Sequence, residues 1–208
     1  MTAALGSTWE TLAVGYKPHA SVTSIHTALD GLAAIMREQK LGADDISKVE
    51  AGLSPMTHVH CAWEYKAQGV TAAQMNLYYG LAVIALDGMA FTDQYREARL
   101  RDPRILDFVK RISAYVDPEI EAMGGTFRHA ARIKVTTRHG RIAEKLILHR
   151  RGSPEDPLKP EDIEYKFRQV LRSCIPEERS ARILSLVKDL EKSASTRELI
   201  ELVAAPAR

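Results

Sequence analysis

The stretch that decides the fold class is ARIKVTTRHGRIAEKLILH, residues 131–149. Two runs with strand-like patterning flank Arg138-His139-Gly140, and glycine in so short a connection favours a tight turn. The stretch therefore predicts an antiparallel hairpin with strands over Ala131–Thr137 and Arg141–His149. The segments on either side of it are mostly helical in pattern, so we expect an α+β protein.

The clearest helix before the hairpin runs from Ser21 to Lys40. Ser21 or Thr23 is its expected N-cap. Apolar residues recur in it at helical spacing, as one face of a helix requires: Ile25, Leu29, Leu32 and Met36.

Shorter elements fill the space between that helix and the hairpin. We expect a strand over Lys48–Leu53, a polar histidine-bearing loop over Ser54–Gly69, and an apolar helix from Thr71 to Leu86 that ends at Asp87-Gly88. Asp102-Pro103 is a typical helix start, a capping residue followed by proline in the first turn. The buried stripe of that helix is expected to be Ile105, Phe108, Val109 and Ile112.

The strongest break in the chain lies just after the hairpin, where residues 152–157 read GSPEDP. Beyond it, helices are expected over Pro160–Cys174, Pro176–Ser193 and Thr196–Ala204. We therefore expect an incoming connection (1–14), an α+β domain (15–152) and a helical tail (153–208). Three short helices are marginal alone, so the apolar stripes of the tail need another surface to pack against.

Composition excludes several classes of protein. The chain has 208 residues, of which 45% are hydrophobic, and a net charge of +2, too small to indicate nucleic acid or an anionic membrane as partner. Cys61 and Cys174 lie far apart and form no CxxC pair, as is usual in a reducing compartment. No secretion signal and no apolar run long enough to span a bilayer is present, so we expect a cytoplasmic protein.

The first candidate site is Lys17-Pro18-His19, followed by His26. A lysine ammonium can bind a substrate carboxylate, and histidine can move protons near neutral pH. Spacing alone favours a surface lysine beside a partly buried histidine.

A second candidate is Thr57-His58-Val59-His60-Cys61, because imidazole and thiolate are the usual zinc ligands. No second ligand pair lies at a suitable spacing, so we expect a loop without metal. Tyr78 and Tyr79 lie in the apolar helix; one of them could face a cleft and supply a phenol, although aromatic residues at helical spacing usually belong to the core.

Other motifs are weak or absent. The basic runs at residues 138–141 and 149–151 are expected to be solvated edges of the hairpin rather than phosphate sites. The sequence has no GxGxxG, Walker-type loop, GxSxG or HExxH, and two isolated cysteines cannot hold an iron–sulfur cluster. We expect neither a metal nor another cofactor.

The order of these signals resembles the MmgE/PrpD superfamily, which includes 2-methylcitrate dehydratase, cis-aconitate decarboxylase and iminodisuccinate epimerase. YKPHASVTSIHTALDGL (16–32) is similar to the motif that opens its second domain, with Lys17, His26 and Asp30 in register. Further stretches follow in the family's order: LGADDISKVEAGL, AAQMNLYYGLAVIALDG, DPRILDFVKRISAYVD, and the hairpin with RGSPEDPLKPEDIEYKF. The resemblance covers roughly residues 5 to 200.

The resemblance implies a lid-type α+β domain followed by a tail that, in relatives, packs on a larger all-helical domain. It implies Lys17, His26 and Tyr79 as catalytic residues, and Lys17, His19 and Thr23 as substrate-binding residues. Two departures stand out: His19-Ala20 replaces a frequent Tyr-Pro, and Val22-Thr23-Ser24 replaces a stretch rich in cysteine and arginine. Bound carboxylates need charged or multiply hydrogen-bonded partners. Loss of the arginine-rich stretch beside Lys17 therefore favours a smaller or less charged substrate.

The resemblance places the helical domain that would complete the active site outside this sequence, so we expect either a naturally split enzyme or a fragment of a longer one. The resemblance therefore predicts the carboxy-terminal half or subunit of a lyase, a dehydratase or a decarboxylase of a small polycarboxylic acid, with a helical partner. A dimer or a heterotetramer is expected. Two alternatives are an epimerase or racemase of the same family, and a non-catalytic subunit that binds small acids or acts as a scaffold.

Overall fold

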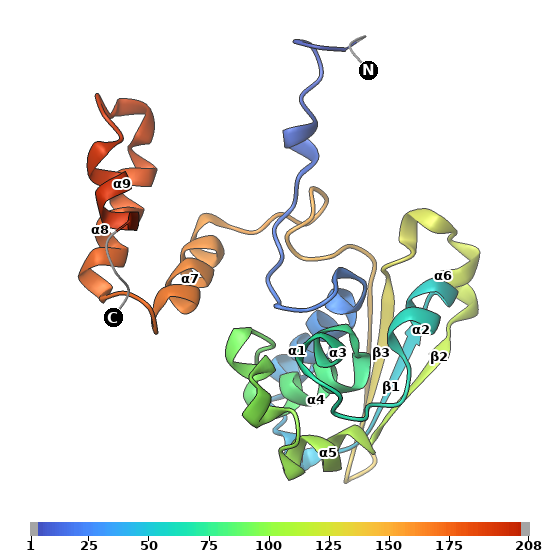
Figure 1. The fold of residues 1–208 in the computed structure, drawn as a ribbon. Helices are drawn as coiled ribbons and strands as arrows, with labels where there is room; N and C mark the ends of the chain where they lie inside the picture. Colours follow the sequence, from blue (N-terminus) through green and yellow to red (C-terminus); the bar gives the residue numbers. More distant parts are fainter. Residues whose placement is uncertain (1–3, 205–208) are drawn as a thin grey trace. The chain divides into compact units, whose positions relative to one another are not determined.

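The computed structural model describes residues 4–204. The chain divides into two compact units, Met1–Pro157 and Leu158–Arg208. The first unit combines a sheet with helices and the second is helical, as the ribbon in Figure 1 shows. The predicted α+β class is confirmed.

A mixed four-stranded sheet organises the first unit. Its strands are β1 (Ile46–Leu53), β2 (Ile112–Val116), β3 (Ala131–Thr137) and β4 (Ile142–Ile147), in the order β2-β1-β3-β4. β1 pairs in parallel with β2 and antiparallel with β3, and β3 pairs antiparallel with β4. Strand β2 lies at one edge of the sheet in Figure 1.

The predicted hairpin is confirmed. Thr136 pairs with Ile142, and Gly140 adopts a left-handed φ of 77° in the turn. Along β3 the side chains alternate between fully and partly buried, as expected for a strand that covers a core on one face only.

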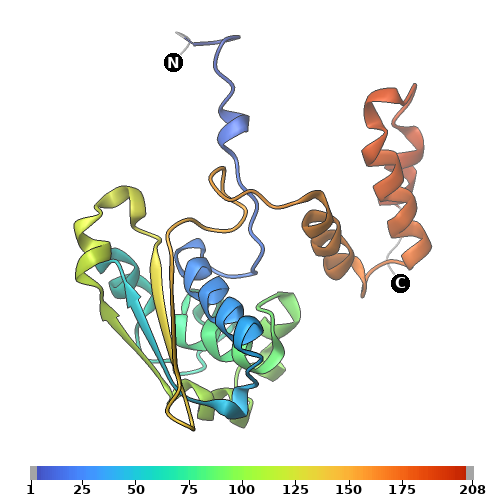
Figure 2. The same ribbon diagram turned by 180° about the vertical axis from the view of Figure 1, so that it is seen from behind.

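Helices cover that face. They are α1 (His26–Gln39), α2 (Pro55–Cys61), α3 (Val70–Met75), α4 (Leu77–Asp87), α5 (Pro103–Val109) and α6 (Pro118–Ala122), with short 3-10 turns between them. Helix α1, which faces the viewer in Figure 2, packs on β3, β4 and α4. The core they enclose is almost wholly apolar; its largest fully buried members include Leu29, Leu32, Leu81, Ile105 and Phe108.

The opposite face of the sheet is polar and held by ion pairs. Arg132 donates to Asp117 at 2.7 Å and to Glu144 at 3.1 Å. Glu50 pairs with Lys48 at 2.9 Å. Such a charged face disfavours stacking with another sheet, because stacking would bury these charges.

Two expected boundaries are wrong around α1 and α5. Helix α1 begins at His26, after a 3-10 turn over Thr23–Ile25, and neither Ser21 nor Thr23 caps it with its side chain. Asp102 does cap α5, accepting from the Arg104 N–H at 2.9 Å. Ile112, however, belongs to β2 and not to the stripe of α5.

The expected loop over Ser54–Gly69 is partly wrong, because it contains α2. The Ser54 hydroxyl accepts a hydrogen bond from the Thr57 N–H at 3.2 Å, and Pro55 occupies the first turn. These are the features that mark the start of α5 at Asp102-Pro103.

The single helix expected over Thr71–Leu86 is in fact two, α3 and α4. Asn76 is extended (φ −97°, ψ 124°); its side chain accepts from the Tyr79 N–H at 3.0 Å and donates to the Trp63 carbonyl at 2.7 Å. An asparagine that caps a new helix in this way ends the previous one. The expected stop at Asp87-Gly88 is confirmed, with Gly88 left-handed.

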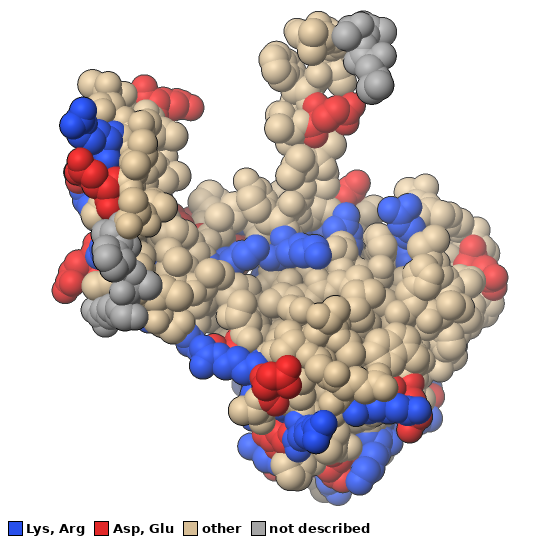
Figure 3. All heavy atoms as spheres, in the orientation of Figure 1, with Lys and Arg blue, Asp and Glu red and all other residues tan. Residues whose placement is uncertain are grey.

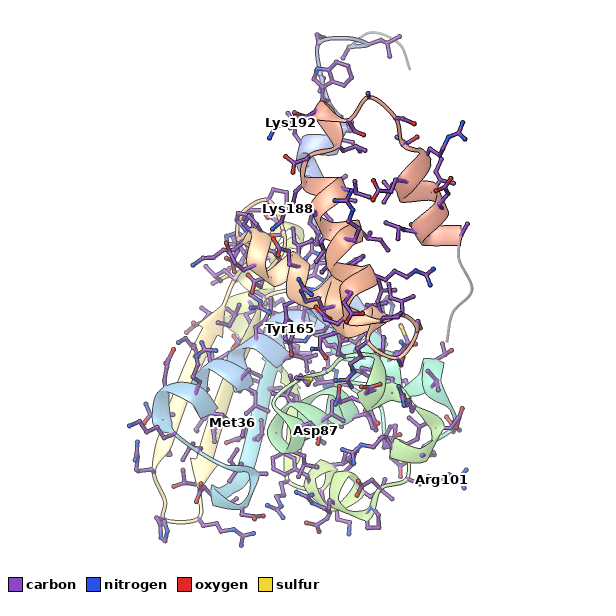
Figure 4. All side chains as sticks on the ribbon, turned by 90° about the vertical axis from the view of Figure 1, so that its left-hand side faces the viewer. Met36, Asp87, Arg101, Tyr165, Lys188 and Lys192 are labelled. Carbon is purple, nitrogen blue, oxygen red and sulfur yellow. The ribbon has the colours of Figure 1, made fainter. Side chains whose placement is uncertain are left out.

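The second unit contains α7 (Pro160–Leu171), α8 (Glu177–Lys188) and α9 (Arg197–Ala204), the three helices expected there. Polar contacts join them, such as Arg182 with Glu198 and Lys188 with Glu164. Figure 4 marks Tyr165 on α7, and Lys188 and Lys192 at the end of α8 and in the turn that follows. Large apolar side chains stay exposed in this unit: Tyr165, Val170, Val187, Leu190, Ile200 and Val203.

Between residues 4 and 204, no helix combines the length and the apolar character needed to cross a membrane.

Candidate functional site

The segment that carries Lys17 and His19 is fixed to three distant parts of the first unit. The Tyr16 N–H donates to the Gly152 carbonyl at 2.7 Å. The Ala20 N–H donates to the Ala90 carbonyl, and the Gln74 side chain donates to the Ala20 carbonyl, both at 2.9 Å. The backbone that leads into α1 is therefore held in place by tertiary contacts.

His19 lies on this segment and faces α1. Its side chain is buried, and its Nε2 atom lies 2.9 Å from Oδ1 of Asp30, one turn into the helix. The carboxylate of Asp30 can only accept, so Nε2 of His19 carries the hydrogen. Asp30 also lies 3.9 Å from Nε of Arg151.

His26, the first residue of α1, is 1% exposed. Its Nε2 lies 3.3 Å from the Ser21 carbonyl oxygen, which can only accept a hydrogen bond. Burial, followed by the nearby His19, lowers the pKa of His26 to about 3. His26 is therefore a neutral imidazole near neutral pH, with the hydrogen on Nε2.

Lys17 completes the group. Its side chain is largely exposed, and Nζ lies 3.4 Å from the same Ser21 carbonyl oxygen. The rings of His19 and His26 meet edge to face, with centroids 5.1 Å apart. The structure thus brings Lys17, His19 and His26 together, with Asp30 added. We call these four residues the lysine–histidine cluster. Thr23 lies between them in sequence and begins the 3-10 turn that precedes His26.

Tyr79 is not part of this cluster. It is fully buried in α4, and its phenol donates to the Gln94 carbonyl. Its ring packs against Tyr65 and Tyr95, at centroid distances of 4.9 and 5.5 Å. Burial raises the pKa of the Tyr79 phenol well above its ordinary value, so it stays protonated.

Tyr95, which the sequence analysis did not single out, links Tyr79 to the cluster. Its phenol is buried beside the hydroxyl of Ser21, and burial raises its pKa. Ser21 in turn offers its carbonyl to Lys17 and His26. No local pattern predicts this link, because Tyr95 lies in a 3-10 turn more than seventy residues from Ser21.

Further basic residues border the cluster. The Thr27 hydroxyl donates to the His129 carbonyl, which brings the segment before β3 to the first turn of α1. Burial lowers the pKa of His129, and the nearby cations Arg128 and Arg150 lower it further. In Figure 3, Lys and Arg side chains are visible on the first unit near the point where the amino-terminal segment leaves it.

The histidine string on α2 forms no metal site. His60 is exposed and Cys61 is buried, and burial raises the pKa of the Cys61 thiol to about 11. Within residues 4–204, no group of three or more histidine, cysteine or acidic side chains is arranged to hold a metal ion.

A shallow hollow of about 280 Å³ lies elsewhere in the first unit. It is lined by residues that include Leu86, Phe108, Arg104 and Arg111. Arg111 is already engaged there, by Asp107 at 2.7 Å and by the Ile46 carbonyl at 3.1 Å. None of the predicted site residues lines this hollow.

The chain matches known proteins over nearly its whole length. Residues 19–192 match the MmgE/PrpD C-terminal domain. The chain is 27% identical, over 211 residues, to the cis-aconitate decarboxylase-like protein oryM of Aspergillus oryzae; the match covers 98% of this chain and 43% of that protein. The chain thus spans less than half the length of this relative. With most of its residues in one family domain, and with the motifs in the family's order, the chain belongs to the MmgE/PrpD family, of which it carries the carboxy-terminal domain.

Proposed function

We propose that this chain supplies one wall of a lyase active site for a small polycarboxylic acid, and that a helical domain supplies the other wall. The observation that carries the proposal is the lysine–histidine cluster: a lysine, two histidines and an aspartate gathered where the incoming segment meets α1. The relative's name, which refers to cis-aconitate decarboxylase, agrees with a polycarboxylate substrate.

Lys17 is the residue of this wall that meets a substrate carboxylate. Its ammonium is exposed, and among residues 4–204 it is anchored by a long contact to the Ser21 carbonyl. In a dehydration, the proton next to a carboxylate is removed before water leaves; in a decarboxylation, carbon dioxide leaves its electron pair on carbon. Both routes build negative charge that spreads into a neighbouring carboxylate. A fixed cation stabilises this charge more in the transition state than in the ground state, and it thereby accelerates the reaction.

His26 has a supporting role. It is neutral, buried and bonded to the Ser21 carbonyl, so it fixes the backbone that carries Lys17. Tyr79 would have to release the Gln94 carbonyl before it could donate a proton to a substrate. We therefore assign the first contact with substrate to the exposed Lys17, and the second to His19, which is bonded to a carboxylate rather than to the backbone.

Exposed apolar surface supports a helical partner domain. In the incoming segment Leu5, Trp9 and Leu12 are 86%, 64% and 83% exposed. In the second unit, Ile200 and Val203 are 60% and 64% exposed. Soluble proteins seldom leave so many large apolar side chains uncovered within short segments unless another surface packs on them. The partner domain can belong to another chain or to another part of the same protein.

The test is co-purification followed by an assay. The tagged chain is expressed together with its neighbouring genes, and the proteins that bind it are identified by mass spectrometry. A stoichiometric helical protein, and turnover of a di- or tricarboxylic acid by the complex, are the expected results. A chain that purifies alone and binds a dicarboxylate, without turnover in any mixture, would instead favour a non-catalytic acid-binding subunit.

A further inference from the structure

His19 and His26 lie side by side but have different surroundings. His26 donates its one N–H to a backbone carbonyl, in a site where burial keeps the ring neutral. His19 faces a carboxylate, with Nε2 2.9 Å from Oδ1 of Asp30. A carboxylate behind an imidazole fixes its tautomer and stabilises the imidazolium, whereas a carbonyl does only the first.

Asp30 is well placed to hold His19. Its side chain is 17% exposed, and Oδ2 is buried and makes no hydrogen bond to any of the residues that the structure describes. The bond to His19 is therefore a main source of stabilisation for this carboxylate, and breaking it would leave a largely buried charge poorly paired.

The titratable and charged groups that face His19 come from three elements. Lys17 precedes it on the same segment, His26 and Asp30 lie on α1, and Arg151 follows β4. Asp30 is the anion in this set and lies within hydrogen-bond distance of His19, whereas the ring of His26 meets the His19 ring edge to face.

We propose that His19 is the residue of this chain that passes a proton to or from the substrate, and that Asp30 is its positioning residue. This inference rests on the proposed lyase function. Because Nε2 is bonded to Asp30, Nδ1 is the ring nitrogen left for the proton transfer.

The step balances for a decarboxylation. The bond between the departing carboxylate and its neighbouring carbon breaks, carbon dioxide leaves, and the electron pair stays on that carbon, delocalised into a second carboxylate. The His19 imidazolium gives one proton to this carbon and becomes neutral, and it then takes one proton from water. The net change is substrate plus one proton to product plus carbon dioxide, with Lys17 stabilising the charged intermediate.

The experiment compares variants of the full chain in its complex with the helical domain. His19→Gln should lower kcat by about a hundredfold or more, since general acid–base groups contribute this much, with KM changed far less. His60→Gln, at an exposed position on α2, is the matched control and should leave both constants unchanged.

Asp30→Asn tests the positioning role through the split between kcat and KM. Without the carboxylate that orients the ring, kcat should fall by about tenfold or more while KM changes far less, and Asp30→Glu, which keeps a carboxylate, should recover part of the loss. Turnover by His19→Gln within threefold of the wild type, or kcat unchanged in Asp30→Asn, overturns the inference. An inactive wild-type complex would instead count against the lyase function itself.

Discussion

Lys17 and His26 share one acceptor: Nζ of Lys17 and Nε2 of His26 lie 3.4 and 3.3 Å from the carbonyl oxygen of Ser21. A surface cation and a buried neutral ring are thereby tied to a single peptide group. The N–H of the same peptide group, that of Val22, donates to the Gln74 carbonyl at 2.9 Å, so the position of the lysine depends on the packing of the first unit.

Lys17→Ala should lower kcat/KM of the complex by about a hundredfold, because it removes the cation that stabilises developing charge. The free energy of unfolding should change by less than about 0.5 kcal/mol, since the side chain is largely exposed. Lys66→Ala is the matched control: Lys66 is 57% exposed and pairs with Glu64 on the surface. Steady-state kinetics and urea denaturation measure both effects; near-normal turnover in Lys17→Ala would refute the assigned role.

His26 should make stability depend on pH. Its pKa is about 3 in the folded chain and near 6.5 when unfolded, so the unfolded state binds the extra proton between these values. The contribution of His26 to stability is complete above pH 6.5 and falls as the pH drops towards 3, by about 1.4 kcal/mol per pH unit.

Urea denaturation at several pH values measures this slope. His26→Gln removes the titrating ring and should flatten the slope relative to the wild type, whereas the exposed His60→Gln should not. Equal slopes in all three proteins would show that His26 is not a buried neutral imidazole.

Tyr79→Phe should lower the free energy of unfolding by about 1–2 kcal/mol, because it leaves the Gln94 carbonyl without its phenol donor. Tyr165→Phe, at a 53% exposed tyrosine of α7, should change it by less than about 0.5 kcal/mol. Activity below the melting temperature should be retained in both. A large loss of kcat in Tyr79→Phe at unchanged stability would restore a catalytic role for this tyrosine.

Gly15→Ala should displace the incoming segment. A Cβ atom at Gly15 would lie 2.3 Å from the Gly152 carbonyl oxygen and 3.1 Å from Cα of Ser153, both backbone atoms. The Tyr16–Gly152 hydrogen bond beside Gly15 should break, and Lys17 should lose its fixed position.

Carboxylate binding by the complex, measured by calorimetry, should therefore weaken in Gly15→Ala. Gly125→Ala is the matched control, because a Cβ atom there meets nothing within 4 Å. Unchanged binding in Gly15→Ala would mean that the path of residues 15–17 does not set the site.

Local patterns predicted much of the fold. The hairpin, the Asp102 cap and the helices of the second unit follow from strand patterning, capping and apolar spacing, which depend on neighbouring residues. Helix α2 could have been predicted, because Ser54-Pro55 is a capping residue followed by proline, as Asp102-Pro103 is. The break at Asn76 was hidden by the apolar residues around it, and it is stabilised by the distant Trp63 carbonyl.

The candidate site was predictable only in part. Lys17, His19 and His26 lie close in sequence, and the structure brings them together. Contacts between elements determine the rest of the site. Asp30 of α1 is bonded to His19 of the incoming segment, and Tyr95 lies beside Ser21 although it comes from a distant 3-10 turn. The burial that makes His26 neutral and encloses Tyr79 is a property of the packed core, which no spacing of residues reveals.

The most direct test of the account is a turnover titration. A fixed amount of helical domain is mixed with increasing amounts of this chain, and a panel of di- and tricarboxylic acids is followed by NMR, which distinguishes loss of water, loss of carbon dioxide and epimerisation. If this chain supplies one wall of the active site, neither part alone turns over a substrate, and the rate saturates at one chain per helical domain. Turnover by the helical domain alone, unchanged when this chain is added, would contradict it.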